Sequence, residues 1–299
     1  MLWKKIFNKK QKQQHNHSHS ESIDSGTVKV VVLSDLGNIR TNNEDIGMFF
    51  RIADEEIRKE KGYLFVVADG MGGHQAGEVA SRLAAETISQ EYFNQNENGS
   101  IEKNLHKAFL AANKKIYSMA SSNPQYRGMG TTCTSLVVKD QQIYFAHAGD
   151  SRAYILQNNS ITRITEDHTY VQELVNRGDI SADEAETHPK RNILTNAMGT
   201  KPDLRVDTGK SALPFLENNR LLLCSDGLYD YIKDNELADI LSTKPLHEAA
   251  SYMIEQAKKR GGHDNITVVL AEKISTDNES AAKETRDFDL PSTKEFDLP

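Results

Sequence analysis

The sequence has only two cysteines, Cys133 and Cys224, among its 299 residues. Each lies within an apolar run, so we expect two buried thiols and no disulfide framework, which fits a reducing compartment. No apolar run approaches the roughly 20 residues of a transmembrane helix, and the start MLWKKIF has too few apolar residues for a secretory signal. We therefore predict a cytoplasmic protein without a membrane span.

Positive charge is also scarce, with 36 Lys and Arg residues against 43 Asp and Glu and a formal net charge of −7. A protein that binds nucleic acid needs a basic face for the phosphate backbone, and this balance provides no broad one. Nucleic acid is therefore excluded as the main partner. A nuclease ranks last among metal phosphohydrolases, because it would need a basic groove or base-stacking aromatic residues.

Both ends of the chain have too little apolar surface to offset the entropy of ordering them. We predict a flexible basic arm over residues 1–25, where His15, His17 and His19 alternate. They could chelate a metal, but no other ligand lies nearby, so a solvated polar tail is favoured. Residues 274–299 form a disordered tail that carries Phe-Asp-Leu-Pro at 288–291 and again at 296–299. The repeat is either a docking motif for a partner or disorder without function.

Between these ends, residues 26–273 have the pattern of a globular domain. Its strand candidates are short and rich in β-branched residues: 28–33, 64–68, 134–138, 143–148, 153–156, 221–224 and 266–271. Helical periodicity predicts helices over about 76–92, 105–119 and 246–257. The turns at 140–142 and 149–151 separate consecutive strands and predict a meander. We expect an α+β fold in which helices cover mainly antiparallel sheets.

Three aspartates lie where apolar strands begin or end. The apolar runs 63–68 and 221–224 each lead into an aspartate followed by glycine, Asp69-Gly70 and Asp226-Gly227, and Asp264 shortly precedes the run 266–271. If these strand ends share one rim, the carboxylates repel one another unless cations neutralise them, and oxygen ligands favour Mg²⁺ or Mn²⁺. The pattern predicts a divalent metal site.

Two further segments place charge where this site is expected. Arg40 stands shortly before Glu44 and Asp45, and its guanidinium can give a tetrahedral phosphate two parallel hydrogen bonds. Asp150 and Arg152 form a tight turn between two strand candidates. Either segment alone is weak evidence, because an arginine near an aspartate is usually a surface ion pair.

Taken together, these segments closely resemble the PPM family of metal-dependent protein phosphatases, also called PP2C, and in particular its bacterial serine/threonine phosphatases. The resemblance covers roughly residues 28–272. The matches are R-x-x-N-E-D at 40–45, D-G-M-G-G-H at 69–74, G-M-G-T-T at 128–132, G-D-S-R at 149–152, S-D-G-L at 225–228 and G-G-x-D-N-I-T at 261–267.

The resemblance implies a central β-sandwich of two mainly antiparallel sheets, flanked by helices in four layers, with a two-metal centre at one end. It makes Asp69 the bridging ligand, the Gly70 carbonyl a ligand of the second ion, and Asp226 and Asp264 the remaining carboxylates. It further implies that Glu44 and Asp45 orient metal-bound waters and that Arg40 clamps the phosphate. His74 resembles the family's proposed general acid, and Asp150 matches a ligand of a third, weaker ion, together with Asp226.

The resemblance also implies a mobile flap at about residues 165–200 that contacts the substrate. His168 and His188 lie in it and are expected to be packing or hydrogen-bonding residues. The loop at 52–61 and both tails are additions that could alter substrate choice or location. We expect an active, monomeric phosphatase for phosphoserine and phosphothreonine on proteins that opposes a cognate Ser/Thr kinase. The alternative is a sensor or binding module of this fold with weak activity.

Overall fold

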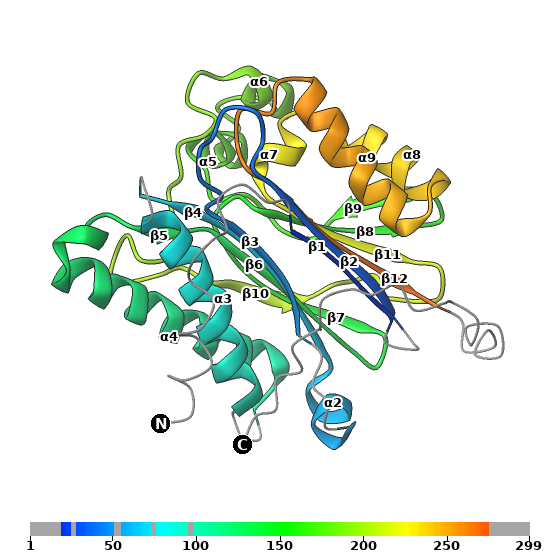
Figure 1. Cartoon of the computed structure of the whole chain (residues 1–299), viewed down its shortest axis with the longest axis horizontal. Coiled ribbons are helices and arrows are strands. Elements are labelled where there is room, and N and C mark those ends of the chain that lie inside the picture. The colour runs from blue at the N-terminus through cyan, green and yellow to red at the C-terminus, as the bar shows by residue number, and fades with distance from the viewer. Residues whose placement is uncertain (1–18, 25–27, 51–54, 73–75, 95–98, 275–299) are drawn as a thin grey trace.

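Two antiparallel six-stranded sheets form the centre of the computed structural model, which describes residues 19–24, 28–50, 55–72, 76–94 and 99–274 (Figure 1). One sheet has the order β1-β2-β12-β11-β8-β9, and the other has the order β10-β7-β6-β4-β3, with β5 paired to β4. The strands of the first sheet are β1 (His19–Asp24), β2 (Val28–Asp35), β12 (Ile266–Lys273), β11 (Arg220–Cys224), β8 (Arg152–Gln157) and β9 (Ser160–Arg163). Those of the second are β10 (Asp207–Lys210), β7 (Gln142–Ala148), β6 (Cys133–Lys139), β4 (Tyr63–Met71), β3 (Asp45–Phe50) and β5 (Gly130–Thr131).

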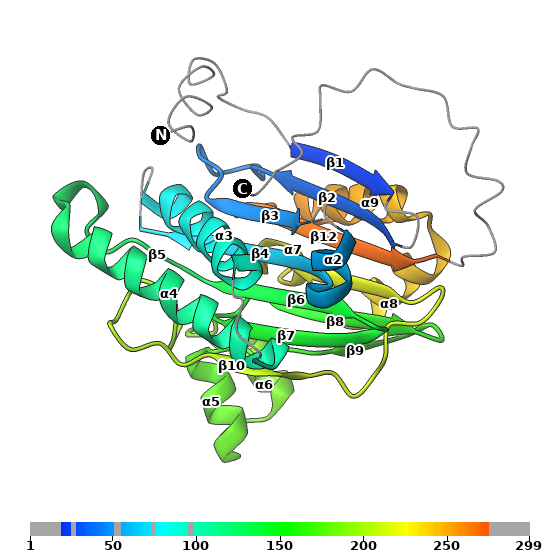
Figure 2. The ribbon, with the colours of Figure 1, turned by 90° about the horizontal axis from the view of Figure 1, so that it is seen from below.

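Helices cover the outer face of each sheet (Figures 1 and 2). The helices α3 (Ala76–Asn94) and α4 (Ile101–Ser122) pack on the sheet that contains β4, whereas α7 (Asp226–Tyr229), α8 (Asp234–Thr243) and α9 (Leu246–Lys259) pack on the other. The remaining helices are α2 (Glu55–Lys61), η1 (Pro124–Tyr126), α5 (Tyr170–Arg177) and α6 (Ala182–Thr187). The four-layer α+β sandwich expected from the sequence is confirmed.

Three buried clusters hold these layers together. Phe65, Leu136 and Leu223 belong to the cluster between the sheets, where the inward side chains of both sheets meet. The other two clusters lie between each sheet and its helices, and they contain the predicted helix stripes, such as Phe109 on α4 and Met253 on α9. Cys133 and Cys224 are both free and buried, as predicted.

The structure differs from the predictions at three segments. Residues 19–24, assigned to the flexible arm, pair with β2 as strand β1. Pairing at an edge needs only backbone hydrogen bonds, so this strand lacks the apolar alternation by which strands are recognised. Within the predicted loop 52–61, residues 55–61 form helix α2. The remaining residues of the arm, with His15 and His17, and the tail 275–299 lie outside the described residues.

The third difference concerns the predicted meander. The turn after β6 does connect antiparallel neighbours, because β6 pairs with β7 throughout. The next turn, Gly149-Asp150-Ser151, instead carries the chain from β7 in one sheet to β8 in the other. Short spacing predicts that two strands are close, but it does not predict whether they share a sheet.

Among the described helices, none is both long enough and apolar enough to cross a membrane.

Candidate functional site

The strands β3 and β4 bring Asp45 and Asp69 side by side, because the two residues face each other in the antiparallel register. Directly opposed residues project from the same face of a sheet, so both carboxyl groups lie on one face. The predicted strand 64–68 ends three residues too early, since β4 continues to Met71. The extension is stabilised by β5, in which Thr131 pairs with Gly70.

The backbone around Asp69 is fixed by two threonines. The Asp69 amide donates to Thr132 Oγ1 at 3.0 Å, and its carbonyl accepts from the Thr132 amide and from Thr131 Oγ1, each at 2.9 Å. Gly70 follows without room for a side chain, since a Cβ there would lie 2.2 Å from the carbonyl oxygen of Gly77, at the start of α3. The close contact with α3 therefore requires glycine at position 70.

The other sheet supplies Asp226 and Asp264 from neighbouring strands. Asp226 does not end β11 but opens the short helix α7 after Ser225, and Asp264 comes just before β12. The two loops touch, because a Cβ on Gly227 would lie 2.0 Å from the carbonyl oxygen of Asn265. Asp226 Oδ1 is buried and has no hydrogen-bond partner among the described residues. A buried carboxylate oxygen without a hydrogen-bond partner in the protein is expected of a metal ligand.

Arg40 reaches this rim from the loop between β2 and β3. Its Nη2 donates to Asp264 Oδ2 at 2.6 Å, and about half of its side chain is exposed. Asn265 holds the loop in place, because its Nδ2 donates to the carbonyls of Leu36 at 3.0 Å and Asn42 at 3.1 Å. Its Oδ1 accepts from the Glu44 amide at 2.8 Å. Arg40, Glu44 and Asp264 therefore share one framework.

Asp45 links the two sheets beneath the site. Ser225 Oγ donates to Asp45 Oδ2 at 2.7 Å and accepts from the Thr267 amide at 3.0 Å. Asp45 is buried, and desolvation raises its pKa to about 6, although the hydrogen bond from Ser225 acts in the opposite direction. The sequence motifs contain Ser225, Thr267 and Asn265, but only the structure reveals their role in holding the acidic residues.

Asp150 lies on the turn that crosses between the sheets. Gly149 has a φ of +116°, and a Cβ on it would lie 2.5 Å from Thr132 Cβ. On the other side, Ser151 Oγ lies 2.7 Å from Thr132 Oγ1, so both neighbours of Asp150 are packed against the residue that holds Asp69. Asp150 is itself buried, and desolvation, followed by the charge of Asp167, raises its pKa to about 7.

The carboxyl groups are close enough to influence one another strongly. Desolvation and then the negative charges of nearby acidic residues raise the pKa values of both Asp69 and Asp226 well above the ordinary carboxyl value. The charges that act on Asp69 are those of Asp45, Asp226, Asp150 and Asp264, and those that act on Asp226 are those of Asp150, Asp264, Asp230 and Asp45. Such crowding favours a bound cation. In the described part of the chain, no three acidic, histidine or cysteine side chains already converge on one ion, and Asp264 is paired with Arg40.

The predicted flap begins and ends next to the carboxylate turns. It carries α5 and α6, which project from the sandwich in Figure 2. Thr131 and Met198 form a two-way backbone bridge at its end. His168 bonds Asp207 and His188 accepts from the Lys190 amide, which confirms the prediction of hydrogen-bonding roles for both histidines. His74 lies outside the described residues, so its predicted role stays a prediction.

Comparison with known proteins gives a consistent result. The family described as "Protein phosphatase 2C" matches residues 34–174. The chain is 41% identical over 244 residues to the serine/threonine phosphatase stp of Listeria welshimeri, an alignment that covers 80% of this chain and 94% of that protein. The crystal structure of the serine/threonine phosphatase Stp1 from Staphylococcus aureus superposes with a TM-score of 0.73 at 33% identity, covering 88% of this chain and 99% of that one. The catalytic domain of the phosphatase PstP in complex with two manganese ions superposes with a TM-score of 0.69 at 33% identity, covering 83% and 99%.

Proposed function

The chain belongs to the protein phosphatase 2C family and is a serine/threonine protein phosphatase, and from this premise we propose that it works with two divalent cations, Mn²⁺ or Mg²⁺, held by Asp69, Asp226 and Asp264. The observation that carries the proposal is the buried Asp226 Oδ1 without a hydrogen-bond partner among the described residues. Desolvation and then the charges of Asp150 and Asp264 raise the pKa of Asp226, and the charge of Asp226 contributes to the raised pKa of Asp69.

The residues divide the work by position. Asp69 and the Gly70 carbonyl would hold the ions from one sheet, with Asp69 shared between them, and Asp226 and Asp264 would hold them from the other sheet. Glu44 and Asp45 would orient the water molecules at the site, and Asp150 with Asp226 would hold a third, weaker ion. When bound, a pair of divalent ions activates water as a nucleophile near neutral pH and neutralises the charge on the phosphoryl oxygens.

Arg40 receives the phosphate. Its guanidinium stands half-exposed at the rim and is oriented by Asp264, so a phosphoryl group can accept hydrogen bonds from it next to the metal carboxylates. His74, which the sequence motif D-G-M-G-G-H places after Asp69, gives a proton to the departing serine or threonine oxygen. The flap at about 165–200 contacts the polypeptide on either side of the phosphorylated residue.

The substrates are phosphorylated proteins, and the enzyme opposes a cognate Ser/Thr kinase in the cytoplasm as a monomer. Support for a cytoplasmic location comes from the two free, buried cysteines, since thiols persist in a reducing compartment. The repeated Phe-Asp-Leu-Pro of residues 288–299 docks a partner.

A phosphothreonine peptide tests the function. Wild-type enzyme should release phosphate with Mn²⁺ and stop in excess EDTA, while Asp69→Asn should lose turnover. Asp239→Asn, an exposed position on α8, is the matched control and should retain it. Undiminished turnover in EDTA would contradict the metal requirement. Tight binding of Mn²⁺ and peptide without turnover would instead indicate a sensor or binding module.

A further inference from the structure

His168, at the start of the flap, holds Gly149, the residue that precedes Asp150, through both of its peptide groups. The His168 amide donates to the Gly149 carbonyl at 2.6 Å, and the Gly149 amide donates to His168 Nδ1 at 3.2 Å. Because Gly149 has the positive φ and the close packing described above, the Ala148–Gly149 and Gly149–Asp150 peptides have little freedom to adopt another orientation. The orientation of these two peptides determines the direction in which the Asp150 side chain leaves the turn.

The contacts of the His168 ring define one protonation state. Asn196 Nδ2 lies 2.7 Å from Nδ1, and the orientation of this amide follows from its other bonds, in which Nδ2 donates to the Arg205 carbonyl and Oδ1 accepts from the Arg205 amide. Two donors therefore face Nδ1, which must be unprotonated. Nε2 lies 3.0 Å from Asp207 Oδ2 and must carry the proton. The ring is neutral, protonated on Nε2, and fully buried.

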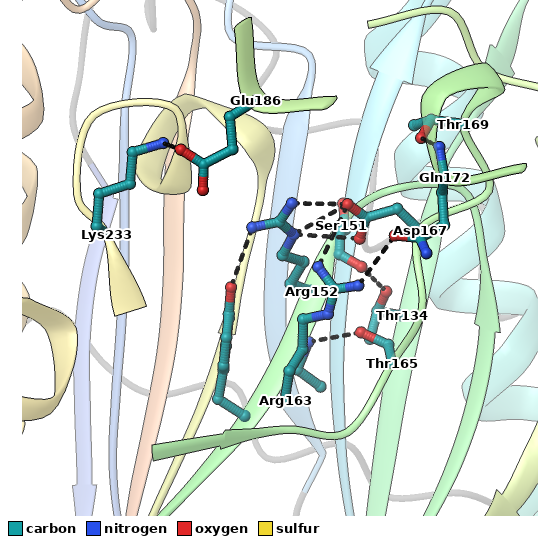
Figure 3. A network of polar contacts seen from close by, with 12 residues as sticks. Thr134, Ser151, Arg152, Arg163, Thr165, Asp167, Thr169, Gln172, Glu186 and Lys233 are labelled. Carbon is teal, nitrogen blue, oxygen red and sulfur yellow. Dashed lines mark hydrogen bonds and ion pairs between the residues drawn. The ribbon is translucent and has the colours of Figure 1, made fainter. Parts of the chain in front are cut away.

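The neighbouring residue Asp167 holds the far side of the same turn. Figure 3 shows its carboxylate facing Arg152, whose Nε lies 3.1 Å from both Asp167 oxygens and whose Nη2 lies 2.7 Å from Oδ2. Ser151, which precedes Arg152, is held through its carbonyl, which accepts a hydrogen bond from Thr134 Oγ1 at 2.7 Å. Adjacent flap residues thus hold Gly149 and Arg152, which flank Asp150 and Ser151.

His168 also connects the two ends of the flap. Its carbonyl accepts from the Thr195 amide at 2.9 Å, and Asn196 bonds its ring, so the returning chain is tied to the outgoing one. The next residue, Thr169, caps α5 by accepting from the Gln172 amide at 3.2 Å. One side chain therefore lies at the junction of the Asp150 turn, both ends of the flap and β10.

We propose that His168 is a positioning residue whose unprotonated Nδ1 and backbone amide hold the two peptide groups that flank Gly149, and so set the direction of the Asp150 carboxylate. This inference rests on the proposed function to the extent that Asp150 binds a cation. A purely space-filling histidine would need only its volume, whereas a positioning histidine needs a hydrogen-bond acceptor at the place of Nδ1.

Two amide substitutions separate these roles. In His168→Asn the amide oxygen lies near the place of Nδ1 and can accept from Gly149, whereas in His168→Gln the amide nitrogen lies near the place of Nε2 and can bond Asp207 only. Calorimetric titration of the full chain with Mn²⁺ measures the effect. His168→Gln should weaken the lower-affinity part of Mn²⁺ binding by about 10-fold or more, as when other supporting residues of metal ligands are removed. His168→Asn should retain most of it.

A double-mutant comparison assigns the effect to Asp150. In an Asp150→Asn background, His168→Gln should cause no further loss, because the group that it positions is already gone. His247→Asn, at an exposed position on α9, is the control and should bind Mn²⁺ as wild type does. Equal losses in His168→Asn and His168→Gln, or an undiminished loss in the Asp150→Asn background, would overturn the proposal.

The wild-type protein offers a test that needs no variant. Nitrogen-15 NMR of the histidine rings should show His168 neutral and protonated on Nε2 between pH 6 and 8, with or without Mn²⁺. A ring protonated on Nδ1 would overturn the proposal directly. Failure of the proposed function would be seen separately, as absence of Mn²⁺-dependent phosphate release by the wild type.

Discussion

Mn²⁺ should stabilise this protein more strongly as the pH rises from 5 to 8. Asp45 and Asp150 are buried, and desolvation raises their pKa values to about 6 and about 7. Such a group keeps its proton in the folded protein after the unfolded chain has lost it, so the metal-free protein loses stability as the pH rises through the raised pKa. A bound cation that replaces these protons prevents this loss of folding stability.

The magnitude follows from the two pKa values. For each group that is protonated in the folded state and ionised in the unfolded state, a rise of one pH unit lowers the free energy of unfolding by about 1.4 kcal/mol. Between pH 5 and 8, Asp150 contributes about two such units and Asp45 about one, so the stabilisation by Mn²⁺ should grow by about 4 kcal/mol. In a domain of this size, the increase in Tm caused by Mn²⁺ should therefore be about 8 to 16 °C larger at pH 8 than at pH 5. Asp69 and Asp226 act in the same direction.

Thermal unfolding at pH 5, 6, 7 and 8, in EDTA and in saturating Mn²⁺, measures the effect. His147 has the opposite sign, because desolvation and then His168 lower its pKa to about 3, so its contribution is lost as the pH falls below 6.5. That contribution is the same with and without Mn²⁺ and cancels in the difference. Asp150→Asn should reduce the increase in Mn²⁺ stabilisation between pH 5 and 8 by about 3 kcal/mol, while Asp239→Asn should leave this increase unchanged. Equal stabilisation by Mn²⁺ at pH 5 and pH 8 would refute the reasoning.

Three further predictions concern single residues. Arg40→Ala should lower kcat/KM for a phosphopeptide by about 100-fold, the loss of a charge-assisted phosphate contact of about 3 kcal/mol, and unchanged steady-state kinetics would show that Arg40 does not bind the phosphate. Gly149→Ala should lower the free energy of unfolding by about 3 kcal/mol in chemical denaturation, because its φ is +116° and its Cβ would lie 2.5 Å from Thr132 Cβ; a wild-type midpoint would be inconsistent with that packing. Asp226→Asn should abolish turnover while the protein stays folded in circular dichroism, and wild-type activity in this variant would remove Asp226 from the metal site.

The sequence predicts the layers and the main acidic residues because both are local patterns. An apolar run followed by Asp-Gly appears at Asp69 and again at Asp226, and amphipathic periodicity marks α4 and α9. These signals depend on neighbouring residues alone, so they can be read without a structure.

The pairing between distant segments could not be predicted in the same way. Alternation gives a strand its two faces but not its partner, so the register that places Asp45 opposite Asp69 appears only in the structure. The crossing from β7 to β8 is a similar case, since a hairpin and a change of sheet can have turns of the same length. The contacts of Asn265 could not be predicted either, because its three hydrogen-bond partners come from residues 36–44, far away in the chain.

The most direct measurement of the central claim is the anomalous scattering of Mn²⁺ in crystals of the protein. We expect two strong Mn²⁺ peaks between the two sheets, both next to Asp69 and bounded by Asp226 and Asp264. A weaker third peak should lie between Asp150 and Asp226. Peaks elsewhere, or no peak near Asp69 at a Mn²⁺ concentration that supports full phosphatase activity, would contradict it.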